Sequence, residues 1–77
     1  MKFQERITDE LKASDYTQKE IAKYLKIDPA NITNWKTGKN VPSIETLFEL
    51  CKLLKVSADY LLGLDDILNN YGREKKT

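Results

Sequence analysis

Histidine is absent from this chain, and cysteine, glycine and proline are scarce. The 77 residues include no histidine, one cysteine, three glycines and two prolines. Without histidine there is no imidazole general base, and no cysteine–histidine nucleophile pair can form. A lone cysteine without histidine also excludes a typical zinc site, and no glycine-rich phosphate loop is present. We therefore expect no catalytic residues, no metal and no cofactor.

The chain also has no large excess of either positive or negative charge, and no long apolar run. The formal net charge is +1, so the overall charge does not indicate a polyanionic partner. No apolar run approaches the length of a membrane span, and the N-terminus has no signal-peptide pattern. One cysteine is compatible with a reducing compartment, and we expect a cytoplasmic protein without membrane contact. A chain of this length makes one small domain, which must be stabilised by helix packing, with dimerisation as a further aid.

Helix start and stop signals are concentrated in one central stretch. Thr17 is followed three residues later by Glu20, which forms a capping box. Asp28-Pro29 supplies an acidic N-cap with proline at the first helical position, and Gly38 provides a C-terminal stop. These signals predict two short helices joined by a tight turn, over about residues 18–25 and 29–36.

Apolar periodicity predicts three more helices and an all-α fold. One helix covers about residues 2–12, one follows the cap Ser43, and one covers about 58–62, between Ser57 and Gly63. The helix after Ser43 is predicted to bury a broad apolar face: Ile44, Leu47, Phe48, Leu50, Cys51 and Leu54. Three caps also have hydrophobic staples: Tyr16 with Ile21, Ile27 with Ile32, and Val56 with Leu61.

The C-terminal end follows a further helical pattern. Leu64, Ile67, Leu68 and Tyr71 have the i, i+3, i+4, i+7 spacing of a short sixth helix. Periodicity alone leaves two alternatives open: the stripe packs back on its own chain, or it meets a partner chain. We assign residues 1–64 to the folded domain and residues 65–77 to a short C-terminal helix and tail.

Positive charge is concentrated on the central helix pair. Residues 17–40 hold Lys19, Lys23, Lys26, Lys36 and Lys39 against Glu20 and Asp28. Residues 41–64 hold Lys52 and Lys55 against Glu45, Glu49 and Asp59. The excess lies on the motif that would meet phosphates, so its distribution favours a nucleic-acid partner where the net charge does not.

Three segments, TQKEIAKYL, ITNWKTGKNVPSIETL and LLKVSADYLLG, occur in an order and at a spacing that resemble the phage-repressor/Cro (Xre-like) helix-turn-helix family. The resemblance covers about Phe3 to Leu64. It implies a compact five-helix domain whose second and third helices form the DNA-binding unit. It also implies binding to a double-stranded operator, usually as a homodimer, to control transcription in a bacterium or phage.

The resemblance places the base-reading positions at the start of the third helix. They fall on Pro29, Ala30 and Asn34, with Asn31 and Thr33 close by. Pro29 and Ala30 depart from the glutamine or serine that family members often carry, and are limited to apolar contact with thymine methyls. Asn34 can pair with adenine, whereas Asn31 has the alternative role of supporting the helix cap.

Phosphate contacts are implied on either side of the recognition helix. The residues are Gln18, Lys19, Lys36, Thr37, Lys39 and Asn40. Lys36 stands where many members carry glutamate. Lys26 stands where glycine is usual, because the turn needs a left-handed backbone that costs a lysine on the order of 1 kcal/mol.

Dimerisation and a protein partner are the remaining expectations. The tentative dimer surface comprises Tyr60, Leu64, Ile67, Leu68 and Tyr71. Trp35 and Tyr60 lie in register with apolar faces, so we expect core positions and not base-stacking platforms. An antitoxin or another protein-interaction module is the alternative function, with a toxin as its partner, because a fold does not fix a function.

Overall fold

Five α-helices and a short helical extension make up the described part of the protein. The structure, a computed structural model, describes residues 1–68. The helices are α1 (Phe3–Ala13), α2 (Gln18–Leu25), α3 (Pro29–Thr37), α4 (Ile44–Leu54) and α5 (Ala58–Leu62), and residues 64–68 are also helical. Within this range there is no strand, and no helix is long and apolar enough to cross a membrane. The predicted all-α class is confirmed, and the expected helix ends differ from the observed ones by at most one residue.

Each of the four predicted N-caps forms. Thr17 Oγ1 accepts from the Glu20 backbone N–H at 3.0 Å, and the Glu20 carboxylate accepts from the Thr17 N–H at 2.8 Å, which completes the capping box. The other three caps accept as follows: Asp28 from the Ala30 N–H, Ser43 from the Thr46 N–H and Ser57 from the Tyr60 N–H. Because each such cap is worth roughly 1 kcal/mol, these side chains fix where each helix begins.

Left-handed residues end four of the helices. Gly38 and Gly63 have φ of 82° and 79°, in the region that glycine adopts without steric penalty. Lys26 has φ of 61°, which confirms the left-handed turn expected between α2 and α3. Lys55 ends α4 in the same conformation, φ 60°, and no glycine or asparagine signalled that end in advance.

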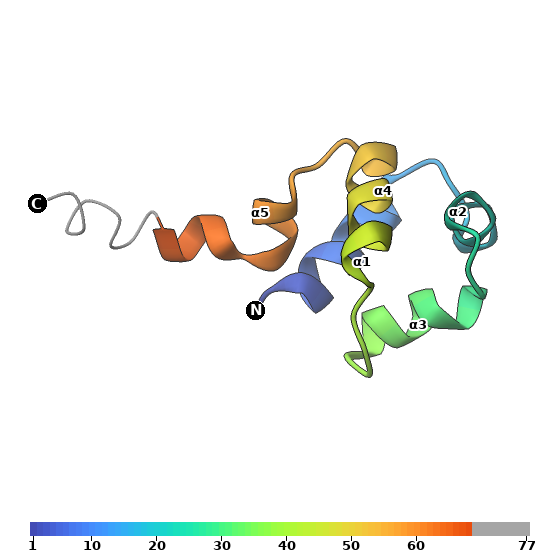
Figure 1. Ribbon diagram of the computed structural model, residues 1–77, viewed down its shortest axis with the longest axis horizontal. Helices are drawn as coiled ribbons and strands as arrows, with labels where there is room; N and C mark the ends of the chain where they lie inside the picture. The colour runs from blue at the N-terminus through green and yellow to red at the C-terminus, as the bar shows by residue number, and fades with distance from the viewer. Residues whose placement is uncertain (69–77) are drawn as a thin grey trace, which may run out of the picture.

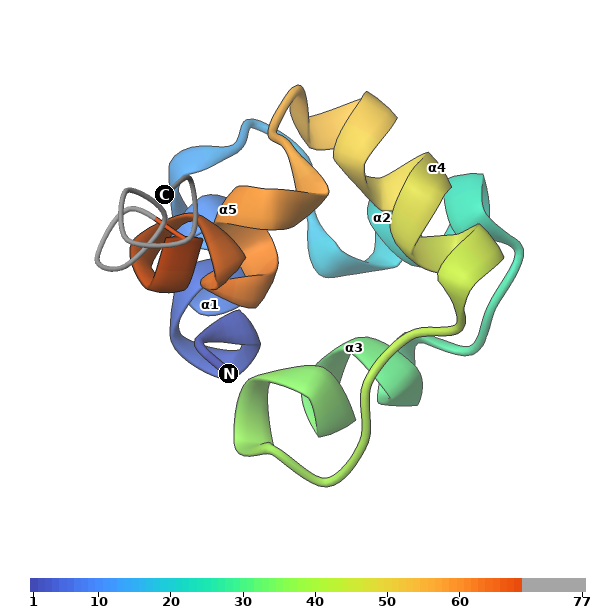
Figure 2. The same ribbon diagram turned by 60° about the vertical axis from the view of Figure 1, so that its left-hand side comes forward.

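The helices pack around α1. It contacts α3 and α5, while α2 contacts α3 and α4, and α4 contacts α5 (Figure 1). Residues 64–68 and the start of α1 lie side by side in both ribbon views, whereas α3 occupies another edge of the molecule (Figure 2). The two helices of the central motif are therefore exposed on the side away from the C-terminal helical segment.

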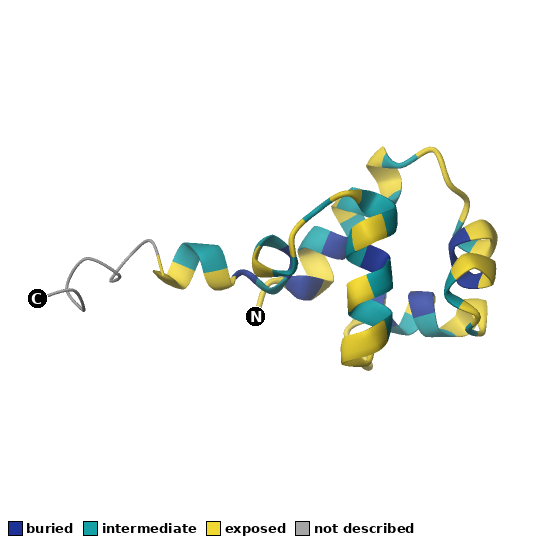
Figure 3. Cartoon of the chain, turned by 45° about the horizontal axis from the view of Figure 1, so that its top comes forward, coloured by how far each residue is buried: buried dark blue, intermediate teal, exposed yellow. Residues whose placement is uncertain are grey.

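The core draws on all five helices (Figure 3). Its buried members are Phe3, Ile7, Ile21, Ala22, Ile32, Trp35, Leu50 and Leu61. Phe3 meets Trp35 edge to face, with ring centroids 6.3 Å apart and planes at 71°. Trp35 is 2% exposed, which confirms its expected core position and anchors α3 from behind.

Two of the apolar contacts expected from periodicity are wrong. Ile44 and Phe48 on α4 are 86% and 61% exposed, and Leu50 is the fully buried residue of that helix. The apolar stripe of α4 is wider than the surface that α2 and α5 cover, so its outer edge remains open. Tyr16, predicted to staple α2, is also exposed, whereas Ile27 and Val56 of the other two staples pack against the core.

A charged cluster attaches residues 64–68 to α1. Arg6 donates to the Tyr60 carbonyl at 2.6 Å, to Asp65 at 2.9 Å and to Asp66 at 3.1 Å. Its guanidinium lies 4.5 Å from the centre of the half-buried Tyr60 ring. Lys2 also pairs with Asp66, and this hydrogen bond is the main cause of the lowered pKa of Asp66, to which Arg6 adds.

The same cluster decides which side of the C-terminal segment faces inward. Its carboxylates meet α1, while Leu64, Ile67 and Leu68 are 38%, 47% and 47% exposed. Their own chain therefore covers these three residues only in part, and both alternatives for the apolar stripe stay predictions. Tyr71, the fourth member of the predicted stripe, lies outside the described residues.

Candidate nucleic-acid interface

One face of α3 is buried and the other is open. Ile32 is fully buried and Trp35 nearly so, whereas Pro29, Ala30 and Thr33 are exposed. The remaining two predicted base-reading residues, Asn31 and Asn34, are partly exposed. The structure thus brings the predicted base-reading positions together on and beside a single outward face.

The amide side chains on this face are available for recognition. Within residues 1–68, the side chains of Asn31 and Asn34 make no hydrogen bond. The cap of α3 is made by Asp28, whose side chain accepts from the Ala30 N–H at 2.9 Å and whose carbonyl accepts from the Asn31 N–H. The Asn31 side chain takes no part in that cap, which leaves its amide free to meet a ligand.

Gln18 connects the start of α2 to α3. Its Nε2 donates to the Thr33 hydroxyl at 2.8 Å and to the Pro29 carbonyl at 3.1 Å. With both amide hydrogens used, the Gln18 side chain offers only an acceptor oxygen, which suits a base amino group better than a phosphate. This interhelical role was not anticipated from the sequence, because it joins residues 11 and 15 positions apart.

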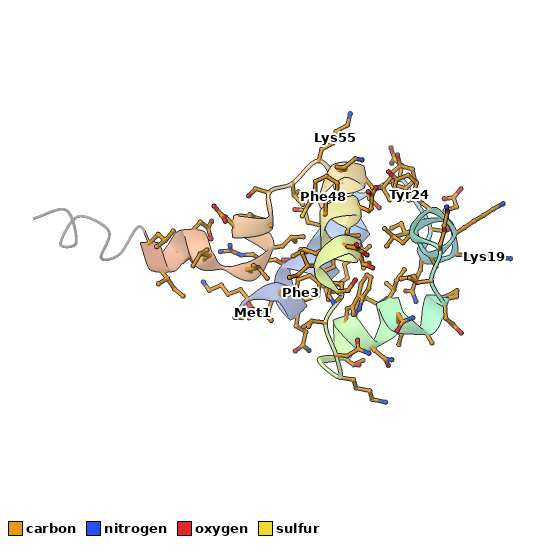
Figure 4. The ribbon with its side chains drawn as sticks, in the orientation of Figure 1. Met1, Phe3, Lys19, Tyr24, Phe48 and Lys55 are labelled. Atoms are coloured by element: carbon orange, nitrogen blue, oxygen red, sulfur yellow. The ribbon has the colours of Figure 1, made fainter. Side chains whose placement is uncertain are left out.

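An anion at the start of α2 would be held by other groups. The first N–H groups of a helix have no intrahelical acceptor and, with the helix dipole, favour a negative charge. Lys19 is exposed and extends from α2 away from the bundle (Figure 4). The backbone N–H groups of the first turn and the Lys19 side chain therefore make this end of α2 suitable for a phosphate.

The segment after α3 is held in place by its own backbone and by α1. Lys39 N–H donates to the Asn34 carbonyl at 2.9 Å, and the Thr37 hydroxyl donates to the same carbonyl at 3.3 Å. Gln4 of α1 donates to the Lys36 carbonyl at 3.1 Å. Lys39 and Asn40 remain exposed beyond this anchored turn, in a position to contact phosphate.

A second lysine accompanies Lys36. Lys12 of α1 and Lys36 of α3 both line a hollow of about 180 Å³, together with Gln18 of α2. Neither lysine forms an ion pair with a carboxylate among residues 1–68. Two unpaired ammonium groups at the junction of α1, α2 and α3 attract an anion to the same side as the predicted phosphate contacts. Lys12 was missed in the sequence because nothing in its local pattern separates it from an ordinary surface lysine.

The geometry of α2, turn and α3 agrees with the comparison with known protein families. Residues 7–61 match the family model described as helix-turn-helix. That range covers more than half of the chain and spans α2 and α3 entirely, so the protein belongs to the helix-turn-helix family.

Similar proteins carry regulatory names. The HTH-type transcriptional regulator ImmR of Bacillus subtilis is 37% identical over 67 residues, which is 87% of this chain and 53% of ImmR. The HTH-type transcriptional regulator DicA of Escherichia coli is 36% identical over 62 residues, 80% of this chain and 46% of DicA. The cryptic phage CTXphi transcriptional repressor RstR of Vibrio cholerae is 30% identical over 63 residues, 82% of this chain and 56% of RstR. The chain thus spans about half the length of these relatives, all of them named as regulators of transcription and not as enzymes.

Proposed function

We propose that this chain binds a specific double-stranded DNA operator and represses transcription. The observation that carries the proposal is the orientation of α3. Its buried Ile32 and Trp35 fix the helix to the core, so that its opposite face, which has both polar and apolar side chains, is exposed to solvent. In a helix-turn-helix the second helix enters the major groove with its N-terminal residues at the base edges. Repression is favoured over activation by the name of RstR, although the related BcrR of Enterococcus faecalis is named an activator.

Readout in this proposal divides between two kinds of contact. Asn34 pairs with adenine, and Pro29 and Ala30 pack against thymine methyl groups. Asn31 and Thr33 lie beside them as further base-facing residues. With two of the leading positions unable to donate or accept through their side chains, direct readout is modest and DNA shape contributes to specificity.

Backbone contacts supply the rest of the affinity. They come from the N-terminus of α2 with Lys19, from Lys36 and Thr37 at the end of α3, and from Lys39 and Asn40 beyond it. Such contacts release counterions, so the affinity falls steeply as salt rises, whatever the sequence.

The proposed operator is pseudo-palindromic because we propose that the protein acts as a homodimer. The exposed Leu64, Ile67 and Leu68 support a dimer contact through the C-terminal stripe, since an apolar row that its own chain leaves open favours a partner. Tyr60 contributes less, because Arg6 covers its ring. Half-sites would then lie about 10 bp apart, centre to centre.

Fluorescence anisotropy tests the proposal. A labelled duplex from the region upstream of the gene is titrated at several salt concentrations, beside a scrambled duplex of the same length and composition. Tighter binding to the upstream duplex with a steep salt slope supports a self-regulating DNA reader. Equal and feeble binding to both duplexes would contradict it and favour the alternative of a protein partner such as a toxin, which the hydrogen-bond-poor start of α3 also suits.

A further inference from the structure

An apolar patch lies on α4, outside the predicted DNA contacts. It comprises Ile44 and Phe48, which are 86% and 61% exposed and line one hollow together with Glu45 and Glu49. Phe48 is on the central part of α4 and Lys19 is on α2, separated from it in the side-chain view (Figure 4). We call Ile44 and Phe48 the α4 patch.

Charged residues border the α4 patch on one side. Phe48, Ile44 and Lys52 are spaced four apart, so they form one row along the helix, with Glu45 beside it. The Lys52 ammonium lies 5.1 Å from the centre of the Phe48 ring and 3.5 Å from the Glu49 carboxylate. The order along α4 is thus acidic and apolar toward its start and basic toward its end.

This order is complementary to itself when α4 is turned end for end. In two antiparallel copies related by a two-fold axis at Phe48, the Phe48 rings meet. At 100° per residue, Lys52 then faces Glu45 of the second copy, and Ile44 faces the half-buried Cys51. A parallel arrangement would bring Lys52 against Lys52 and Glu45 against Glu45.

We propose that the α4 patch docks against the same patch of a second copy of this chain, with the two α4 helices antiparallel. Two apolar side chains from each copy form a contact smaller than a stable free dimer needs, so it is weak on its own. It gains strength when two copies are already held close together, because the contact then becomes intramolecular. The patch begins at Ile44, the first residue of α4, shortly after the proposed phosphate contacts Lys39 and Asn40, so two copies on neighbouring DNA sites would bring it into use. This role in DNA binding rests on the proposed function, whereas the contact itself does not.

Charge exchange at Glu45 and Lys52 tests the contact by sedimentation equilibrium, from micromolar to millimolar chain at low salt. Glu45→Lys alone and Lys52→Glu alone should each weaken self-association about tenfold, because each dimer contains two such pairs. The double variant should restore it. Glu5→Lys makes the same charge change at an exposed residue of α1 that is in no ion pair among residues 1–68, and should leave self-association near the wild-type value. All of these side chains are at least partly exposed, and a circular dichroism melt checks that each variant folds.

Phe48→Lys and Leu68→Lys separate this contact from the C-terminal stripe. Phe48→Lys should abolish the self-association that depends on the charges at Glu45 and Lys52. Leu68→Lys should leave this self-association unchanged. Self-association at the wild-type level in both single charge variants, or failure of the double variant to recover it, would overturn the proposal. If the wild-type protein shows no specific DNA binding by anisotropy, but the charge variants change self-association as predicted, only the proposed function is overturned.

Discussion

Gln18 Nε2 donates a hydrogen bond to Thr33 Oγ1 at 2.8 Å, from the first residue of α2 to the exposed face of α3. The same nitrogen donates to the Pro29 carbonyl, so a single side chain fixes the spacing between the two helices of the motif at their outer surface. The bond thus couples the helix that would approach the backbone to the helix that would read the bases.

Thr33→Val removes the acceptor of that bond without changing the shape of the side chain. Loss of one such bond costs about 0.5–1.5 kcal/mol, so we expect roughly 2- to 12-fold weaker DNA binding and a small loss of stability. A double-mutant cycle with Gln18→Ala, followed by anisotropy, measures the coupling. Thr8→Val is the control, because its hydroxyl bonds within α1, to the Gln4 carbonyl, and Thr8 is not among the predicted DNA contacts. Purely additive effects of Gln18→Ala and Thr33→Val would show that the bond has no role in binding.

Asn34→Ala should relax the preference at one base step. A bidentate amide–adenine pair is worth about 1–3 kcal/mol of discrimination, and within residues 1–68 no protein group replaces it. Binding to a randomised duplex library, read by sequencing, gives the profile. A profile identical to the wild type would remove Asn34 from the reading positions, whereas Asn31→Ala shows whether its neighbour shares the role.

Lys39→Ala should weaken binding on every duplex by a similar factor. An exposed lysine that neutralises one phosphate contributes about one unit to the slope of affinity against salt, so that slope should fall by about one. Anisotropy at several salt concentrations measures it. Lys55→Ala, which removes an exposed lysine at the end of α4, should leave the slope unchanged if the phosphate contacts are confined to the motif.

Gly63→Ala should destabilise the fold by more than about 2 kcal/mol, since a left-handed φ strains alanine by about 1–2 kcal/mol and steric crowding adds to it. Its Cβ would lie 2.9 Å from Lys2 Cγ and 3.2 Å from the Lys2 backbone nitrogen. Lys26→Gly is the contrasting change: relief of left-handed strain opposes the greater entropy of an unfolded glycine, so we expect a gain of about 0–1 kcal/mol. Urea unfolding followed by circular dichroism gives both values, and a tolerated Gly63→Ala would mean that the start of α1 moves freely.

Acid should release residues 64–68 from α1. The pKa of Asp66 is lowered in the folded protein, first by the Lys2 hydrogen bond, so the ionised carboxylate is the form that the fold stabilises. Its contribution is complete above the unfolded pKa of about 4 and is lost as pH falls through the lower folded value. Backbone amide shifts between pH 7 and 2 follow the release. In Asp66→Asn the segment should already be released at pH 7, so the acid transition should be absent. An unchanged acid transition in this variant would assign it to another group.

Local signals in the sequence were sufficient for the helices but not for their packing. The capping box at Thr17, the aspartate at position 28 and the two glycine stops act within one turn, so their outcome can be read without the rest of the chain. Lys55 ends α4 with no such signal, because the preceding helix and the following cap impose the left-handed turn from outside.

Contacts distant in sequence account for what could not be foreseen. Arg6 meets Asp65 and Asp66 across 59 and 60 positions, and no periodicity links them. Periodicity likewise identifies Phe48 and Leu50 as apolar, but only the placement of α2 and α5 decides that Leu50 is covered. At the candidate interface the burial of Ile32 fixed which side of α3 faces outward, whereas the bond from Gln18 depended on where the turn placed α2.

The alternation of buried and open positions along α3 has a consequence for how such a protein changes over time. Ile32 and Trp35 hold the helix, and they are distinct from the residues proposed to read DNA. Substitutions at Ala30 and Asn34 can therefore alter the target with little effect on folding, so new binding preferences are accessible by single steps. Thr33 is the exception, since a change there also disturbs Gln18, and lineages that alter one of this pair should tend to alter the other.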